Sequence, residues 1–208
     1  MRHDRLMGTP VVLLALDDVP GDPLALLREW LQSAQRAGVV SPGDTVFATV
    51  DPRGQPSTRV LGLQAVDETG LVYFINLATR KGRDLAENPR AAGTLYWRES
   101  LQQVNVSGTV ERLDEETCDR IWVGRGVVGT AASLASEQGA PLIDEVRLRQ
   151  RAVQLQAAGR VASRSAQHVA IRLRPDAVEF WQGKSDRLHE RLHYSLNQHG
   201  WRHWRLQP

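Results

Sequence analysis

The fold is decided by residues 46–75, which read VFATVDPRGQPSTRVLGLQAVDETGLVYFI. Runs rich in β-branched and other apolar residues at 46–50, 56–66 and 71–75 are separated by the turn-forming sequences Asp-Pro-Arg-Gly and Asp-Glu-Thr-Gly. Short turns that contain glycine join antiparallel strands, whereas parallel strands need a long crossover connection. This stretch therefore predicts a β-meander, from which antiparallel sheets and barrels are built.

Helices and further strands are expected on both sides of this meander. In the helix that precedes it, Asp22 suits the N-cap, Pro23 the first helical position and Gly38 the C-cap. The other expected elements are helices at 79–87, 114–122 and 142–157, strands at 90–97, 102–112, 168–174, 178–182, 187–194 and 201–206, a loop at 124–141 and a linker at 159–165. We therefore expect an N-terminal arm over residues 1–20, then one mainly β (α+β) domain with peripheral helices over residues 21–208.

The composition limits the class of protein. The chain has 208 residues, of which 41% are hydrophobic and 24% charged, so it can bury a core. Only two of its 26 basic residues are lysines, and no block of basic residues occurs, which disfavours nucleic-acid binding. No apolar run approaches the roughly 20 residues of a membrane helix. The single Cys118 excludes an intramolecular disulfide and cysteine-based metal sites within one chain. We expect a cytoplasmic protein without a metal and without membrane association.

The first candidate site is Thr79-Arg80-Lys81-Gly82, where a predicted strand leads into a predicted helix. The free N–H groups of a helix N-terminus, a guanidinium and an ammonium all favour an anion such as phosphate. The alternative is a solvated basic turn. Arg59 lies within a predicted strand. Because side chains alternate between the two faces of a strand, this segment alone is as compatible with a solvent-facing Arg59 as with one that contacts a ligand.

The second candidate is the C-terminal segment Arg187-Leu-His-Glu-Arg191. At strand period two, Arg187, His189 and Arg191 would project from one face, where their repulsion calls for an acid of the protein or an anionic ligand. The alternative is a solvated strand face. Trp97 and Trp181 are candidates for the walls of a flat aromatic ligand site.

Seven motifs connect these candidates: Arg59-Val-Leu-Gly-Leu, Phe74-Ile-Asn-Leu-Ala-Thr-Arg-Lys81, Glu87-Asn-Pro-Arg90, Gln102-Gln103-Val-x-Val-x-Gly108, Val178-Glu-Phe-Trp-Gln-Gly183, Arg187-Leu-His-Glu-Arg191 and Arg205-Leu-Gln-Pro208. In this order they resemble the FMN-binding core of the pyridoxamine 5'-phosphate oxidases, over residues 21–208. The resemblance implies a split β-barrel that acts as a homodimer, with FMN at the subunit interface.

The resemblance also implies roles for individual residues. Arg59, Arg80 and Lys81 would hold the FMN phosphate, while Trp181 and Arg191 would complete the cofactor site from the second subunit. Arg187 and His189 would be the catalytic pair that faces the substrate. The implied cofactor-binding set is Arg59, Val60, Gln64, Phe74, Ile75, Thr79, Arg80, Lys81, Gln103, Gln138, Trp181 and Arg191, and the implied substrate-binding set is Arg125, Arg187 and His189.

Departures from the family's pattern bear on the substrate. The vitamin B6 oxidases of the family bind the substrate phosphate through a lysine where this chain has Gln64. A tyrosine and a serine that help them fall at Ile121 and Gly129, so that only Arg125 remains. A lost charged hydrogen bond costs about 1.5–3 kcal/mol, which disfavours a phosphorylated substrate.

The phenazine-biosynthesis FMN oxidases form a branch of this family that resembles the chain at 95–99, 102–103 and 187–192. They also lack the lysine, and their substrates are flat, anionic phenazine carboxylates. The sequence therefore favours an FMN-dependent oxidase of secondary metabolism that passes a hydride from a reduced carboxylated ring to flavin N5, with dioxygen as acceptor. Two alternatives stay open: a pyridoxine/pyridoxamine 5'-phosphate oxidase with a rebuilt phosphate site, and a flavin-binding split-barrel protein without turnover.

Overall fold

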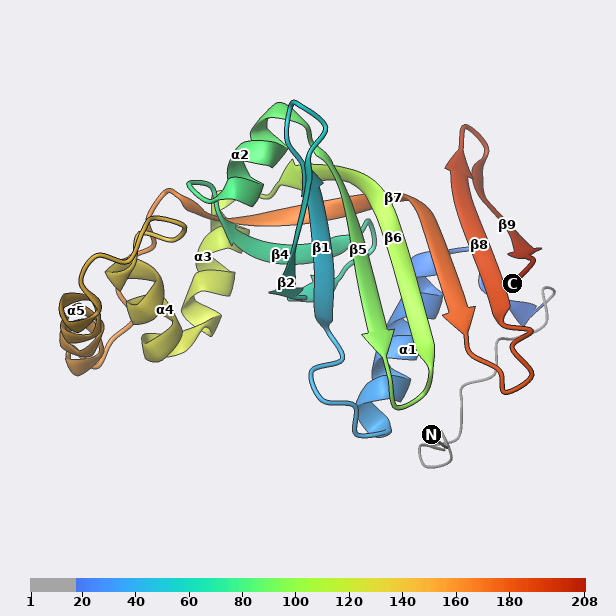
Figure 1. Ribbon diagram of the computed structural model, residues 1–208, viewed down its shortest axis with the longest axis horizontal. Coiled ribbons are helices and arrows are strands. Elements are labelled where there is room, and N and C mark those ends of the chain that lie inside the picture. Colours follow the sequence, from blue (N-terminus) through green and yellow to red (C-terminus); the bar gives the residue numbers. More distant parts are fainter. Residues whose placement is uncertain (1–17) are drawn as a thin grey trace.

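The computed structural model describes residues 18–208, which form a nine-stranded antiparallel sheet that curls into half a barrel (Figure 1). The strands are β1 Asp44–Val50, β2 Pro56–Gly62, β3 Ala65–Val66, β4 Leu71–Asn76, β5 Arg90–Trp97, β6 Gln102–Arg112, β7 His168–Gln182, β8 Glu190–Asn197 and β9 Gly200–Leu206. They follow the order β2-β1-β5-β6-β7-β4-β3, and β8 lies between β7 and β9. Every pairing among the described strands is antiparallel, which confirms the predicted mainly β class.

Helix α1, Pro23–Arg36, closes the core at one face of the sheet (Figure 1). The predicted N-cap is confirmed, because the Asp22 carboxylate accepts the Leu24 N–H at 2.9 Å. Trp30 on its apolar side packs edge-on against Phe180 of β7, with the ring centroids 5.1 Å apart. The helix ends with Ala37 as its C-cap rather than Gly38, which follows in the left-handed region at φ 78°.

The other helices are α2 Arg80–Glu87, α3 Glu115–Gly124, α4 Gly126–Ala135 and α5 Glu145–Ala157. The last three extend beyond one end of the sheet (Figure 1), and no residue of α5 is buried. The predicted loop at 124–141 is wrong, because α4 occupies much of it. Its small polar residues bond within the helix: the Thr130 hydroxyl donates to Gly126 O at 2.8 Å, and the Ser133 hydroxyl to Gly129 O at 2.9 Å.

Four predicted strands differ from the structure. The run 56–66 breaks into β2 and β3. The runs 168–174 and 178–182 form one strand, β7, because a bulge leaves only Asp176 unpaired while Pro175 and Ala177 continue the ladder opposite Gly108 and Ser107. A Cβ at Gly108 would lie 1.9 Å from Arg174 O, so this close approach requires glycine. The run 187–194 becomes a strand only at Glu190.

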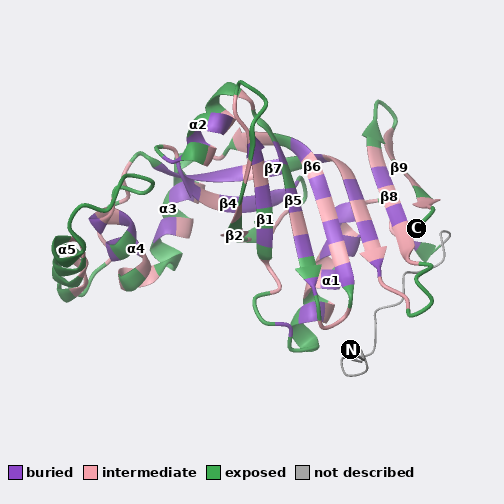
Figure 2. Ribbon diagram, in the orientation of Figure 1, coloured by how far each residue is buried: buried purple, intermediate pink, exposed green. Residues whose placement is uncertain are grey.

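The sheet has two distinct faces, since directly paired residues project to the same side. The inner face, defined by the row Phe47, Gly93, Val106, Val178 and Tyr194, belongs to the core that packs on α1. The outer face is defined by the row Val60, Val46, Thr94, Asn105, Glu179, His193 and Trp204. The alternation is visible along the central strands in Figure 2. The outer face exposes apolar side chains, with Val60 61%, Val46 46% and Trp204 41% accessible.

Most of the predicted N-terminal arm, residues 1–17, lies outside the described residues. Its end is attached to the sheet, because the Tyr194 hydroxyl donates to Pro20 O at 2.9 Å. Among residues 18–208, no helix combines the length and the apolar character needed to cross a membrane.

Candidate cofactor site

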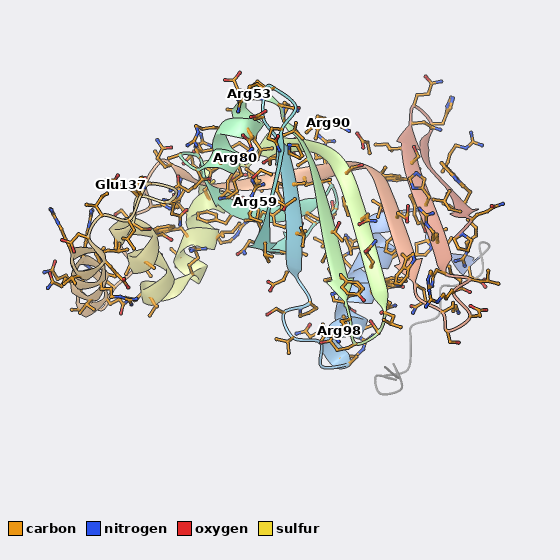
Figure 3. All side chains as sticks on the ribbon, viewed as in Figure 1. Arg53, Arg59, Arg80, Arg90, Arg98 and Glu137 are labelled. Atoms are coloured by element: carbon orange, nitrogen blue, oxygen red, sulfur yellow. The ribbon has the colours of Figure 1, made fainter. Side chains whose placement is uncertain are left out.

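Three predicted phosphate-binding residues come together at the start of α2; Figure 3 shows Arg59 and Arg80 between β2 and this helix. Lys81 Nζ donates to Thr79 Oγ1 at 3.0 Å. Burial lowers the pKa of Lys81, and the charge of Arg59 lowers it further. Burial likewise lowers the pKa of Arg59, aided by the charge of Arg80 and opposed by Asp84. The three cations therefore act on one another, and a bound anion would relieve their repulsion.

The N-terminus of α2 adds hydrogen-bond donors to these cations. Thr79 is the N-cap residue, but its hydroxyl donates to Asn76 O at 2.6 Å and caps no helical N–H. Gly82 in the first turn is held against the preceding loop, where a Cβ would lie 2.3 Å from Leu77 O. Uncapped N–H groups, the helix dipole and the three cations all favour a bound anion such as a phosphate group.

The guanidinium of Arg59 is held in place by groups that sequence reasoning missed. Arg59 Nη1 donates to Thr49 Oγ1 at 2.9 Å, and Nη2 donates to Ser57 Oγ at 2.8 Å. The Thr49 hydroxyl in turn donates to the Asp84 carboxylate at 2.7 Å, and Asp84 is only 4% exposed. The sequence evidence for a role of Asp84 was its i,i+4 spacing from Arg80. In the structure, Arg80 Nε lies 3.9 Å from Asp84 Oδ2.

A second group of predicted residues forms one cross-strand row on the outer face. Tyr96 pairs with Gln103, Gln103 with Trp181, and Trp181 with Arg191, so that four adjacent strands contribute one residue each. The His189 ring lies 4.9 Å from the Trp181 ring. This row offers a polar group beside an aromatic wall, as a flat heterocycle requires.

Trp97, the other predicted wall, is wrong as a ligand contact. It is 2% exposed, and its ring lies 6.1 Å from Trp30 in the core. Its indole N–H donates to Pro42 O at 2.8 Å. Strand alternation places it on the inner face, since it follows Tyr96 of the outer-face row.

The predicted stack of three cations on one strand face is also wrong. Arg191 lies on β8 and forms a bidentate ion pair with Glu179 of β7, with both N–O distances 3.0 Å. Arg187 precedes the strand, in a bend with φ 66°. Its guanidinium is exposed, and within residues 18–208 it forms no hydrogen bond or ion pair. An acid of the protein therefore satisfies Arg191, whereas Arg187 is left available to an external anion.

Arg125 and Phe74 belong to a third group, beside α3 and α4. The Arg125 guanidinium carbon lies 5.5 Å from the Phe74 ring centroid, and Nη2 donates to Ser133 Oγ at 3.1 Å. The His168 ring stacks on the Phe74 ring, with the centroids 6.4 Å apart, and burial lowers the pKa of His168, as does the charge of Arg125. A Cβ at Gly129 would lie 3.3 Å from Arg125 Cβ, so glycine leaves room for this arginine.

Of the remaining predicted residues, Gln138 adjoins this third group, whereas Gln64, Ile75 and Val60 lie elsewhere. Gln138, after α4, lines a cleft of about 550 Å³ together with Asn76, Arg83 and His168. Gln64 is exposed, and its amide donates to Gly62 O at 3.0 Å. The Ile75 side chain is buried in the core, and Val60 lies on the outer face.

We call Arg59, Arg80 and Lys81 the anion cluster, because these cations favour a bound anion. Within one protomer, Arg59 of this cluster and the outer-face row Tyr96, Gln103, Trp181 and Arg191 lie on opposite sides of the sheet. Arg59 pairs with Phe47 of the inner face, whereas Gln103 and Trp181 belong to the outer face. The strands that carry Arg59 and Gln103 are also three strand spacings apart, about 14 Å.

Comparison with known proteins places these groups in context. Residues 31–182 match the family model described as pyridoxamine 5'-phosphate oxidase, and residues 168–208 match the pyridoxine 5'-phosphate oxidase C-terminal dimerisation region. A dihydrophenazinedicarboxylate synthase from Burkholderia lata is 39% identical, with 100% of this chain and 98% of that protein covered. A pyridoxine/pyridoxamine 5'-phosphate oxidase from Rubrobacter xylanophilus is also 39% identical, with 94% and 91% covered.

A solved structure extends this similarity to the fold. The crystal structure of PhzG from Burkholderia lata 383, in complex with tetrahydrophenazine-1-carboxylic acid, superposes with a TM-score of 0.92 at 40% identity. The match covers 97% of this chain and 100% of that chain. The half-barrel sheet, its similarity to this structure and the matched dimerisation region agree with the split β-barrel that the sequence predicts. On this evidence the chain belongs to the pyridoxamine 5'-phosphate oxidase family.

Proposed function

We propose that this protein is an FMN-dependent oxidase of phenazine-type secondary metabolism, which removes a hydride from a reduced, flat, carboxylated ring with dioxygen as acceptor. The observation that carries the proposal is the exposed guanidinium of Arg187, which no acid among residues 18–208 contacts, two residues before His189 and its contact with Trp181 on the outer face. An arginine fork free of protein acids suits a carboxylate, and the indole suits a flat ring. The full-length similarity to a dihydrophenazinedicarboxylate synthase supports this reading.

The described residues fit FMN. Arg59, Arg80 and Lys81 at the N-terminus of α2 would hold its phosphate, and Gln103 and Trp181 would contact its ring system. When bound, FMN supplies the two-electron chemistry that links oxidation of the substrate to reduction of dioxygen.

The active unit in this proposal is a homodimer, with each cofactor site built from two protomers. The anion cluster would come from one copy, and Gln103, Trp181 and Arg191 from the other. The opposite placement of the two groups supports this arrangement. So do the match of residues 168–208 to a dimerisation region and the exposed Val46 and Val60 on the outer face.

The chain itself would contribute binding and orientation. The Arg187 fork would hold the substrate carboxylate, and Arg125 a second anionic group of the same ring. His189 accepts the Lys184 N–H at Nδ1, so its neutral ring carries a proton on Nε2 and presents a donor to the substrate. No general base is required, because positioning of an easily oxidised ring can supply much of the rate.

The second candidate is a pyridoxine/pyridoxamine 5'-phosphate oxidase. The 39% identity to the Rubrobacter xylanophilus enzyme and the presence of Arg125 favour it. A flavin-binding protein without turnover is the third; an Arg187 that meets no acid within the described part of the chain, two residues before His189, speaks against it.

The visible spectrum of the purified protein, recorded anaerobically, separates these functions. We expect the spectrum of oxidised flavin, unchanged by pyridoxamine 5'-phosphate and bleached by a reduced phenazine carboxylate. Bleaching by pyridoxamine 5'-phosphate would instead favour the vitamin B6 oxidase as the function. A flavin that neither compound reduces would favour the binding protein, and a colourless protein that takes up no FMN would overturn the proposal.

A further inference from the structure

We propose that Asp186, together with the main chain of Lys184, is a positioning residue that presents Arg187 and His189 to an anionic ring substrate. The inference rests on the proposed function and deepens it. It concerns the turn between β7 and β8, which we define as residues 183–189.

The turn holds Arg187 in a conformation that residues with a side chain seldom adopt. Its φ of 66° lies in the left-handed region, which such residues occupy only when neighbouring contacts enforce it. Two hydrogen bonds do so here. The Leu188 N–H donates to the Asp186 carboxylate at 2.9 Å, and the Arg187 N–H donates to Lys184 O at 3.1 Å.

The same turn sets the tautomer of His189. The Lys184 N–H donates to His189 Nδ1 at 3.1 Å, which leaves the proton of the neutral ring on Nε2. Since the imidazole also lies 4.9 Å from the Trp181 ring, both its direction and its donor are determined before a substrate arrives. Closure of the turn by Asp186 therefore governs the two residues that would face the substrate.

Both ends of the turn are anchored to the sheet. Gln182, which is 2% exposed, donates to Ser100 O at 3.1 Å, and the Gly183 N–H donates to Leu101 O at 2.8 Å. At the other end, Lys184 Nζ lies 3.3 Å from a Glu190 carboxylate oxygen. Between these anchors, Asp186 is exposed, and within residues 18–208 its side chain contacts no cation. Its hydrogen bond to Leu188 is thus its structural contribution.

The test compares Asp186→Ala with Asp186→Asn in the full-length FMN-loaded protein. Asn keeps an oxygen that accepts the Leu188 N–H, whereas Ala removes it. We expect D186A to raise the KM for a reduced phenazine carboxylate about tenfold or more, with FMN affinity and melting temperature unchanged. D186N should stay within about twofold of the parent. The ¹⁵N shifts of His189 at about pH 8.5, where imidazole is neutral, should report the Nε2–H tautomer in the parent and D186N, and a mixture in D186A.

An unchanged tautomer and KM in D186A would overturn the inference, as would D186N behaving like D186A, since charge rather than the hydrogen bond would then matter. The tautomer measurement needs no turnover. If the protein binds no FMN but D186A still loses the tautomer preference, the proposed function fails while the positioning role stands. If the loaded parent turns over and D186A matches it in both readouts, only the positioning role fails.

Discussion

The buried Asp84 carboxylate accepts a 2.7 Å hydrogen bond from the Thr49 hydroxyl, and in this way joins α2 to β1 directly behind the anion cluster. Thr49 also accepts from Arg59, so Asp84 acts through Thr49 on the guanidinium. We predict that Asp84→Ala lowers the free energy of unfolding by about 2–3 kcal/mol, because the buried Thr49 hydroxyl loses its acceptor and Arg59 loses a nearby negative charge. Urea unfolding measures this change. FMN affinity should fall as well, since Arg59 would lose its orientation.

A matched variant separates hydrogen bonding from charge at this position. Asp84→Asn keeps an oxygen for Thr49 but removes the charge near Arg80. Its stability should lie between those of the parent and D84A. Equal stability of D84A and the parent would contradict the role assigned to Asp84.

FMN affinity should depend on pH through Lys81. Burial and the charge of Arg59 lower the pKa of Lys81, so this amine loses its proton at a lower pH than an exposed lysine does. A phosphate favours the ammonium form, and affinity should therefore fall as the pH rises through this lowered pKa, by at most about tenfold per pH unit. Lys81→Met should bind FMN more weakly and with a flatter alkaline profile. Lys184→Met, which changes the chain's other lysine, should keep the parental slope in a fluorescence titration.

Gly82 should be intolerant of any side chain. A Cβ there would lie 2.3 Å from Leu77 O and 2.5 Å from Leu77 Cα, which are backbone atoms that cannot turn aside. We expect Gly82→Ala to displace the first turn of α2, with a loss of about 1–3 kcal/mol in stability and a marked loss of FMN binding. Gly124→Ala in α3 is the control, because nothing lies within 4 Å of its Cβ. An unchanged melting temperature for G82A would refute the close approach.

The sequence was sufficient for the elements whose patterns are local. The Asp22 cap, the strand 90–97 and the turn chemistry of the meander all follow from neighbouring residues, and the structure has them. The strand-to-helix junction at Thr79–Lys81 was predicted for the same reason.

Prediction failed where distant contacts decide the conformation. The segment 126–135 contains Gly, Val, Thr and Ser, which weaken a local helix prediction, and it becomes α4 where its buried side chains pack and the helix contacts α3 and α5. Period-two spacing suggested a strand at Arg187, but the Gln182 anchor and the Asp186 hydrogen bond turn the chain there. Asp84 lies 35 residues from Thr49 in the sequence, so no local pattern indicates their contact.

The stability of the protein should fall in mild acid because of His168. Burial, then the charges of Arg125 and Arg164, lower the pKa of this histidine in the folded state. The unfolded chain therefore binds a proton near pH 6.5 that the folded chain does not, and the free energy of unfolding falls as the pH drops below that value, by up to about 1.4 kcal/mol per pH unit. His168→Gln should flatten this dependence relative to the parent, whereas His199→Gln, at an exposed turn, should not. Identical slopes for the parent and H168Q would contradict the burial argument.

Substrate choice should respond to the residues at positions 64, 121 and 129. In the proposed function, Gln64, Ile121 and Gly129 leave Arg125 as the only one of the family's four phosphate-binding side chains. We predict that the combined variant Gln64→Lys, Ile121→Tyr, Gly129→Ser lowers the KM for pyridoxamine 5'-phosphate by about 10- to 100-fold, since one charged hydrogen bond is worth about 1.5–3 kcal/mol. Gly129→Ser alone should give little, because its Cβ would crowd Arg125 at 3.3 Å without adding a cation. Gln64→Lys alone should give most of the gain. Steady-state kinetics with both substrates measure the change, and turnover of the carboxylated ring should persist in Q64K, because Arg187 and His189 are untouched. If Q64K left the KM for the phosphate ester unchanged, the side chain at position 64 would not reach the substrate. Gln64 would then keep its exposed hydrogen bond to Gly62 O in the FMN-loaded protein as well.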